Sequence, residues 1–166
     1  MLCPVCRYEN FEGEDTCVNC GADLAGRDLP QPAIDYHDTV LGEHLDTLGI
    51  GSFRTLGSGH PAADAIRLMH QEDIDCVLVV DGDHLVGIFT DRDAVVKAAD
   101  KRLGLYRVDD FMTPDPVVLR SADTLAVAIH KMAVGEFRHI PVVDGTRPIG
   151  VVAAADIFRH LVGALA

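Results

Sequence analysis

The chain has 166 residues, of which 48% are hydrophobic and 24% charged, and its net charge is −12. These proportions fit a folded globular protein with one ordinary domain and a small appendage. The acidic balance argues against a nucleic-acid partner, which would need a basic surface to neutralise phosphates. No apolar run approaches the roughly 20 residues that cross a bilayer. The N-terminus also lacks the basic and apolar regions of a signal peptide, so we expect a cytoplasmic protein with no membrane partner.

The first 24 residues hold two C-x-x-C pairs, Cys3 with Cys6 and Cys17 with Cys20. Two thiolates at this spacing can hold one metal ion from a tight turn, and the second pair completes a four-sulfur site. Such a site suits zinc or, in a rubredoxin-like centre, iron. Two disulfides are the alternative, but cytoplasmic thiols stay reduced. Because cysteine fills all four positions, none is open for catalysis, and we predict a structural zinc. The stretch resembles the N-terminal zinc ribbons of many bacterial and archaeal proteins.

Residues 25–39 are predicted to form a linker and the start of a helix that leads into the rest of the chain. Gly26, Pro30 and Pro32 oppose regular structure at its beginning. Apolar residues then recur at helical spacing up to Leu48, which predicts a short helix over residues 35–48.

Residues 53–99 and 116–162 are two copies of one design, offset by 63 residues without a gap. A unit this short cannot close its own core, so two copies packed about a pseudo-twofold axis are the expected folding unit. A cleft between two copies favours a binding module over a single catalytic centre. The clearest matches are Ala65-Ile66-x-x-Met69 with Ala128-Ile129-x-x-Met132, Val79-Val80-Asp81-Gly82 with Val142-Val143-Asp144-Gly145, and Asp93 with Asp156.

Both copies predict the element order β-α-β-β-α, and therefore an α+β fold. In the first copy we expect strands at 53–56, 76–80 and 85–89, a helix from Pro61, a hairpin turn at Asp81-Gly82 and a helix from about Thr90. In the second copy we expect strands at 117–119, 139–143 and 149–153, helices near 124–134 and at 154–164, and a turn at Asp144-Gly145.

The chain resembles a tandem CBS-domain pair, also called a Bateman module, over roughly residues 40–164. The resemblance rests on the duplication and on three phrases in register with it: Asp110-Phe111-Met112-Thr113, His139-Ile140-Pro141-Val142-Val143-Asp144 and Gly87-Ile88-Phe89-Thr90-Asp91-Arg92-Asp93. It implies CBS repeat 1 in residues 40–103 and CBS repeat 2 in residues 104–166, preceded by the ribbon in residues 1–24. The first copy departs from the family pattern, because Leu48-Gly49-Ile50 stands in place of a Met-Thr phrase.

The phrase Thr90-x-x-Asp93 has two interpretations. In the first, Thr90 caps the helix, and the side chain of Asp93 in the first turn accepts a hydrogen bond from Thr90 in return, as in a capping box. In the second, the carboxylate accepts hydrogen bonds from the hydroxyls of a ribose, while the helix N-terminus and Arg92 contact phosphate. The family resemblance implies the second role, since matching Thr and Asp residues contact adenosine ligands. The second copy keeps Asp156 but has Ala153 in place of the threonine and no arginine nearby, which predicts a weaker site.

The resemblance also implies that the base of the ligand lies between the first and middle strands of a copy. The predicted positions are Thr55, Val77 and Leu78 in the first copy and Val118, Ile140 and Pro141 in the second, with His139 as a phosphate neighbour. Ordinary core strand is the alternative interpretation of these positions. Cys76, which corresponds to His139, is interpreted as a small buried apolar residue and not as a metal ligand.

We predict a regulatory protein that binds an adenosine nucleotide (AMP, ADP or ATP) and acts in trans on an unidentified protein partner, as a homodimer through its CBS helices. We predict no enzyme, because the sequence has no Ser-His-Asp arrangement, Gly-rich phosphate loop or open metal site. The alternative is a zinc-ribbon adaptor for protein or DNA whose CBS pair is only a dimerisation scaffold. The residues leave open S-adenosylmethionine-like ligands, occupancy of both clefts, a parallel or antiparallel dimer, and iron in place of zinc.

Overall fold

The structure is a computed structural model that describes residues 2–10, 16–24, 40–48, 51–97 and 103–165. The chain divides into two compact units. The first unit combines residues 1–50, 119–140 and 152–166, and the second combines residues 51–118 and 141–151. Strands and helices are mixed along the chain, so the predicted α+β class is confirmed. In the part of the chain described here, no helix is both long and apolar enough to span a membrane.

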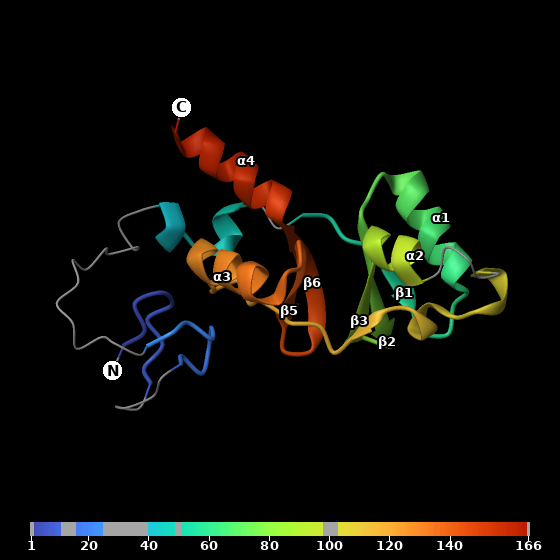
Figure 1. Cartoon of the computed structure of the whole chain (residues 1–166), viewed down its shortest axis with the longest axis horizontal. Coiled ribbons are helices and arrows are strands. Elements are labelled where there is room, and N and C mark those ends of the chain that lie inside the picture. Colours follow the sequence, from blue (N-terminus) through green and yellow to red (C-terminus); the bar gives the residue numbers. More distant parts are fainter. Residues whose placement is uncertain (1, 11–15, 25–39, 49–50, 98–102, 166) are drawn as a thin grey trace. The chain divides into compact units, whose positions relative to one another are not determined.

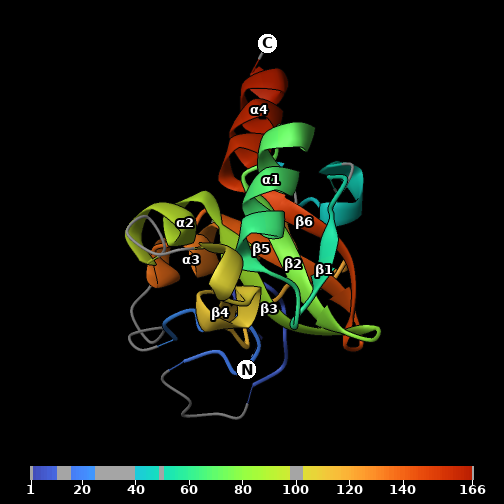
Figure 2. The ribbon, with the colours of Figure 1, turned by 90° about the vertical axis from the view of Figure 1, so that its right-hand side faces the viewer.

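The second unit contains a four-stranded sheet in the order β1-β2-β3-β4. Its strands are β1 (Thr55–Gly57), β2 (Cys76–Asp81), β3 (His84–Thr90) and β4 (Thr113–Pro114). Helix α1 (Ala62–Glu72) crosses between β1 and β2, which pair in parallel and lie side by side in Figure 2. The predicted hairpin joins β2 to β3, and Gly82 occupies its turn at φ 60°. A positive φ of this kind favours glycine, which explains the Asp-Gly signal.

Both faces of this sheet are covered. On one face, Val77, Val79 and Phe89 pack with α1 and with α2 (Asp91–Lys97), and the two helices lie on the same side of the strands in Figure 1. On the other face, Cys76 and Leu78 pack with a second apolar cluster that contains Ile88 and Val151. Burial on both sides explains why β2 is a continuous apolar run and does not alternate with polar residues.

The first unit is built from helices α3 (Leu125–Gly135) and α4 (Ala154–Leu165), which contact each other and the two short 3₁₀ helices η2 (Val40–Gly42) and η3 (Leu45–Leu48). The remaining strands, β5 (His139–Asp144) and β6 (Arg147–Ala153), form a hairpin whose residues 141–151 belong to the second unit. Its turn contains Gly145 at φ 61°, as the sequence predicts.

The predicted helix over residues 35–48 is wrong for residues 40–48, and residues 35–39 lie outside the described residues, as do residues 25–34 of the linker. Two 3₁₀ helices stand there instead, because the backbone between them bonds to another segment. The N–H of Leu45 donates to the carbonyl of Asp123, and the carbonyl of Glu43 accepts from the N–H of Leu125, both at 3.0 Å. These hydrogen bonds take donors and acceptors that an α-helix would use along its own axis.

The predicted strand at residues 117–119 is reduced to a single β-bridge at Leu119, and β4 forms earlier than expected. Thr113 and Pro114 pair with β3, after which Asp115 turns the chain at φ 45°. Pro116 has no N–H to donate, and the N–H of Arg120 donates to the carboxylate of Asp123 at 2.9 Å. The predicted strand is therefore flanked by a bend at Asp115 and by a turn that begins after Arg120.

Helices α1 and α3 end at matching positions of the two copies, in residues that are not glycine. Asp73 has φ 52° and Glu136 has φ 54°. An L-residue in this left-handed conformation is strained, whereas glycine is not. We expect Asp73→Gly to raise the free energy of unfolding by about 0.5–1 kcal/mol. Urea unfolding measures it, with His70→Gly inside α1 as a control that should lower the stability. A decrease for Asp73→Gly would show that the strain is absent.

Candidate functional sites

The described cysteine-rich segments form two similar turns, which we call the first knuckle (residues 3–8) and the second knuckle (residues 17–22). In the first knuckle the N–H of Cys3 donates to the carbonyl of Tyr8, and the N–H of Arg7 donates to the carbonyl of Cys3, both at 2.9 Å. The same two hydrogen bonds recur 14 residues later, each at 2.8 Å, from Cys17 to Ala22 and from Gly21 to Cys17. Each knuckle thus presents its two thiols from one closed turn.

Both knuckles need a left-handed residue directly after their second cysteine. Gly21 takes this position at φ 70°, as its place in the sequence suggests. The first knuckle has Arg7 at φ 55°, a conformation that costs free energy in a residue with a Cβ. The first knuckle therefore retains its shape against a local preference of its own backbone.

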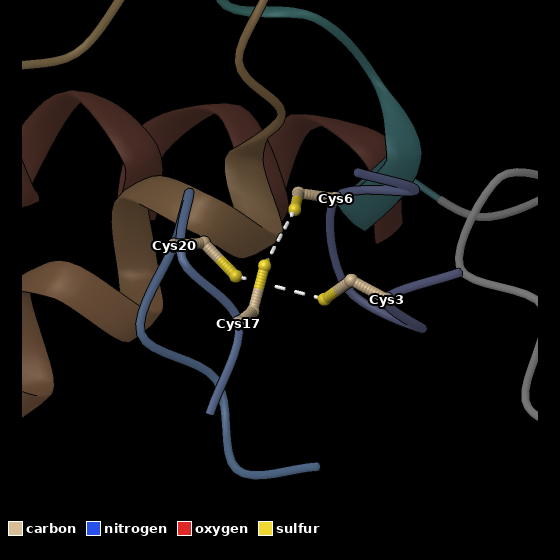
Figure 3. A group of neighbouring side chains, drawn as sticks. All are labelled: Cys3, Cys6, Cys17 and Cys20. Carbon is tan, nitrogen blue, oxygen red and sulfur yellow. Dashed lines mark hydrogen bonds between the residues drawn. The ribbon is translucent and has the colours of Figure 1, made fainter. Parts of the chain in front are cut away.

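The four thiols of the knuckles meet at one point (Figure 3). All four sulfur atoms lie within 4.8 Å of one another, and Cys3, Cys17 and Cys20 are buried. The Sγ of Cys3 lies 3.7 Å from that of Cys20, and the Sγ of Cys6 lies 3.6 Å from that of Cys17. A tetrahedral ion with metal–sulfur bonds of about 2.3 Å separates its sulfurs by roughly 3.8 Å. The cluster therefore has the spacing of a four-sulfur metal site.

The protein environment shifts the pKa values of three of these thiols in different directions. Burial raises the pKa of Cys3 and the pKa of Cys20. Burial also acts to raise the pKa of Cys17, but N–H groups of Cys20, Asn19 and Asn10 stabilise its thiolate and bring its pKa to about 7. Asn10 has a further role, since its Oδ1 accepts a hydrogen bond from the N–H of Val18 at 3.0 Å. No motif points to Asn10, which is buried and links the two knuckles through Tyr8 and Val18.

Thr90 and Asp93 form the reciprocal cap that the first interpretation of their phrase describes. Oδ2 of Asp93 accepts from the N–H of Thr90 at 3.0 Å and from its hydroxyl at 2.8 Å. The N–H of Asp93 in turn donates to Oγ1 of Thr90 at 3.3 Å. Asp93 is a buried charged residue, while Arg92 is exposed and uses its backbone N–H to bond Asp91 at 2.7 Å. The cap fixes the direction in which the carboxylate points.

A lysine that we did not predict completes this group. Nζ of Lys97 lies 2.6 Å from Oδ1 of Asp93 and donates to the carbonyl of Phe111 at 2.9 Å. The spacing of four residues from Asp93 on a helix was the available signal, because such residues share one helix face. One ammonium group therefore joins the carboxylate to the segment just before β4.

The second copy repeats half of this arrangement. The N–H of Ala153 donates to Oδ2 of Asp156 at 3.2 Å, and no hydroxyl accompanies it because alanine replaces threonine. Nη2 of Arg159 lies 2.7 Å from Oδ1 of the same carboxylate. The prediction that no arginine stands near Asp156 is therefore wrong, since Arg159 reaches it from three residues further along α4.

The positions predicted to hold the base differ in exposure. Thr55 is exposed, Val118 and His139 are half-buried, and Val77, Leu78, Ile140 and Pro141 are fully buried. Neighbouring residues of a strand point to opposite faces, so Val77 and Leu78 cannot both turn their side chains toward one ligand. Cys76 is buried as predicted, and burial together with Asp75 and Asp91 raises its pKa to about 12. Its thiol therefore stays protonated at neutral pH.

Comparison with protein families identifies the repeats. The model of the CBS domain matches residues 52–100 and 108–163. These two matches cover more than half of the chain, so the chain belongs to the CBS-domain family. The tandem pair inferred from the duplication is thereby confirmed.

Among curated proteins, the chain is similar to the Arabidopsis thaliana CBS domain-containing protein CBSCBSPB2, with 32% identity over 166 aligned residues. That match covers 98% of this chain and 29% of the relative. The chain thus spans less than a third of the length of this relative.

Two solved structures share the fold. CBSX2, crystallised in complex with AMP, is 24% identical at a TM-score of 0.66, over 75% of this chain and all of that chain. The CBS pair of protein MJ0100, crystallised with 5′-methylthioadenosine and S-adenosyl-L-methionine, is 23% identical at a TM-score of 0.67, over 75% of this chain and 98% of that chain. At this level of identity the likeness establishes the fold.

Proposed function

We propose that the protein is a regulatory sensor that binds an adenosine nucleotide at the Asp93 site. The observation that carries the proposal is the set of partners of this buried carboxylate. Its two oxygens have about four acceptor positions. Three are used, by the N–H and hydroxyl of Thr90 and by the ammonium group of Lys97. One position on Oδ1 remains for a ribose hydroxyl, so the capping role and the ligand role are compatible.

The proposed site comprises Thr55, Val77 and Leu78 for the base, with only one of the two β2 residues contributing its side chain and the other its backbone. Thr90, Arg92 and Asp93 would bind the sugar and phosphate. A second, weaker site would use Val118, His139, Ile140, Pro141 and Asp156. The solved structures with adenosine derivatives support this class of ligand for the fold, while the residues of this chain must supply its selectivity.

Mass spectrometry of small molecules released from freshly purified protein tests the function directly. We expect an adenosine nucleotide, with AMP, ADP and ATP as the candidates. The protein passed over charcoal to remove nucleotide should then rebind the identified compound. Release of a non-purine molecule as the sole ligand would contradict the proposal.

We propose that the knuckles hold one structural zinc ion through Cys3, Cys6, Cys17 and Cys20. The proposed organisation is a ribbon in residues 1–24, a linker in 25–39, and CBS repeats in 40–103 and 104–166. The sulfur distances fit a tetrahedral ion, and a zinc ion bound by four thiolates needs no other ligand. Reduced thiols require a reducing compartment, which supports the cytoplasm.

We further propose a homodimer through the helices of the CBS pair. Large apolar side chains are exposed on helices α2 and α4. Val95 and Val96 on α2 are 70% and 73% exposed, and Phe158 on α4 is 67% exposed. Contacts between identical chains commonly close about a twofold axis. Light scattering should give twice the chain mass at micromolar protein, and Phe158→Glu should shift the equilibrium toward the monomer. A monomer in the parent protein would contradict this proposal.

We propose that the regulated process lies in a partner protein, since the sequence has no Ser-His-Asp arrangement, Gly-rich phosphate loop or open metal site. DNA binding by the ribbon is the alternative that we weigh against it. Residues 1–24 carry one arginine against five acidic residues, a charge that repels the phosphates of DNA. The charge of the ribbon therefore favours a protein partner.

A further inference from the structure

We propose that Lys97 makes the Asp93 site selective for phosphorylated nucleosides over neutral ones. The inference rests on the proposed nucleotide-binding function and names a residue that the family resemblance did not supply. Its basis is the way in which each copy compensates the charge of its aspartate.

The two copies arrange their aspartates alike. One oxygen, Oδ2, accepts from a backbone N–H three residues earlier, and the other, Oδ1, lies beside a cation on the following helical turn. The pairs differ in exposure. The side chains of Lys97 and Asp93 are 42% and 11% exposed, whereas those of Arg159 and Asp156 are 74% and 34% exposed. Solvent screens the first pair less, so its cation has the stronger effect on a bound ligand.

A carboxylate that binds ribose creates a problem for a nucleotide ligand. The 5′-phosphate is carried by the same sugar, so its negative charge must come within one sugar ring of the carboxylate. A charge at this range acts strongly in a partly buried site. Lys97 removes the repulsion, because its ammonium group already balances Asp93 before the ligand arrives. Its position is also fixed, since the carbonyl of Phe111 holds the same nitrogen at 2.9 Å.

Calorimetry with AMP and adenosine on four variants tests the proposal. We expect Lys97→Met to weaken AMP binding by roughly 3- to 10-fold at low salt and to change adenosine binding by less than about twofold. Lys97→Arg keeps the charge and should retain the preference for AMP. Arg159→Met should have a smaller effect. Arg67→Met removes an equal charge from the exposed pair with Asp64 on α1 and should change neither ligand. The loss in Lys97→Met should shrink as salt rises.

The outcomes separate the possible failures. Equal weakening of AMP and adenosine would show that Lys97 only positions the carboxylate, and unchanged AMP binding would show that it has no part; either overturns the inference while the proposed function stands. A parent protein that binds none of adenosine, AMP, ADP and ATP would overturn the proposed function itself. Lys97→Gln replaces Lys97→Met if thermal unfolding shows that the methionine variant is not folded.

Discussion

Replacing Cys17 with serine will abolish metal binding and unfold the ribbon in residues 2–24. About 24 residues bury too little apolar surface to fold alone, so the proposed zinc would supply the stability. Structural zinc sites contribute on the order of 10 kcal/mol to such small folds. We expect elemental analysis to find about one zinc per parent chain and nearly none in Cys17→Ser. Hydrogen exchange of the ribbon amides should rise to the rate of an unfolded chain.

The matched control for this experiment is Cys76→Ala, which removes the fifth cysteine from the core of the second unit. It should keep the zinc and the protected ribbon amides, although it leaves a small cavity. A Cys17→Ser protein that retains both zinc and ribbon protection would refute the assignment. If the purified parent protein has the colour of an iron–sulfur site, the metal assigned to the four cysteines would be iron and not zinc, and the site itself would stand.

Replacing Asp93 with alanine should weaken AMP binding by about 10- to 150-fold, since a lost hydrogen bond to a charged group costs roughly 1.5–3 kcal/mol. Asp156→Ala should have a smaller effect. The reason lies in the partners of each carboxylate: Thr90 adds a hydroxyl that Ala153 lacks, and Asp93 is the more buried of the two. Calorimetry at fixed ionic strength measures both constants.

Asp64→Ala is the control, because it removes a carboxylate from an exposed ion pair on α1. Loss of the cap at Asp93 also costs about 1 kcal/mol of stability, so each variant must be shown to be folded at the assay temperature. If Asp93→Ala binds AMP as tightly as the parent protein, the carboxylate only caps α2. The reverse order of the two aspartates would identify the second copy as the sensor.

Much of the fold was predictable because its signals are local. The Asp-Gly dipeptides required left-handed glycines, and Gly82 and Gly145 occupy that conformation. Helices α1 and α3 begin one residue after the predicted starts, with Pro61 and Thr124 at their N-cap positions. The spacing of the cysteine pairs likewise predicted the cluster, because each knuckle closes through hydrogen bonds within six residues.

The errors arose where distant segments decide the structure. Residues 40–48 have helical spacing, yet hydrogen bonds to residues 123–125 hold them in 3₁₀ turns. Residues 117–119 have strand composition, yet their neighbours are engaged in turns and β4 takes the place beside β3. The family motif ends at the aspartate and therefore carries no signal for Lys97 or Arg159. The motif also does not decide which of Val77 and Leu78 would turn its side chain toward a ligand, since adjacent strand residues point to opposite faces.

The 14-residue recurrence inside the ribbon has a consequence for how that segment opens. Contacts that join its halves include the sulfur pairs Cys3–Cys20 and Cys6–Cys17, and the hydrogen bonds of Asn10 to the second knuckle. Each sulfur pair takes one atom from each half, so neither half contains a complete set of the contacts that hold the ribbon together. We therefore expect the halves to separate in one all-or-none event, with every protected amide of the segment exchanging at a common rate. A stepwise loss of amide protection, with one knuckle exchanging before the other, would indicate that one half is stable without the other.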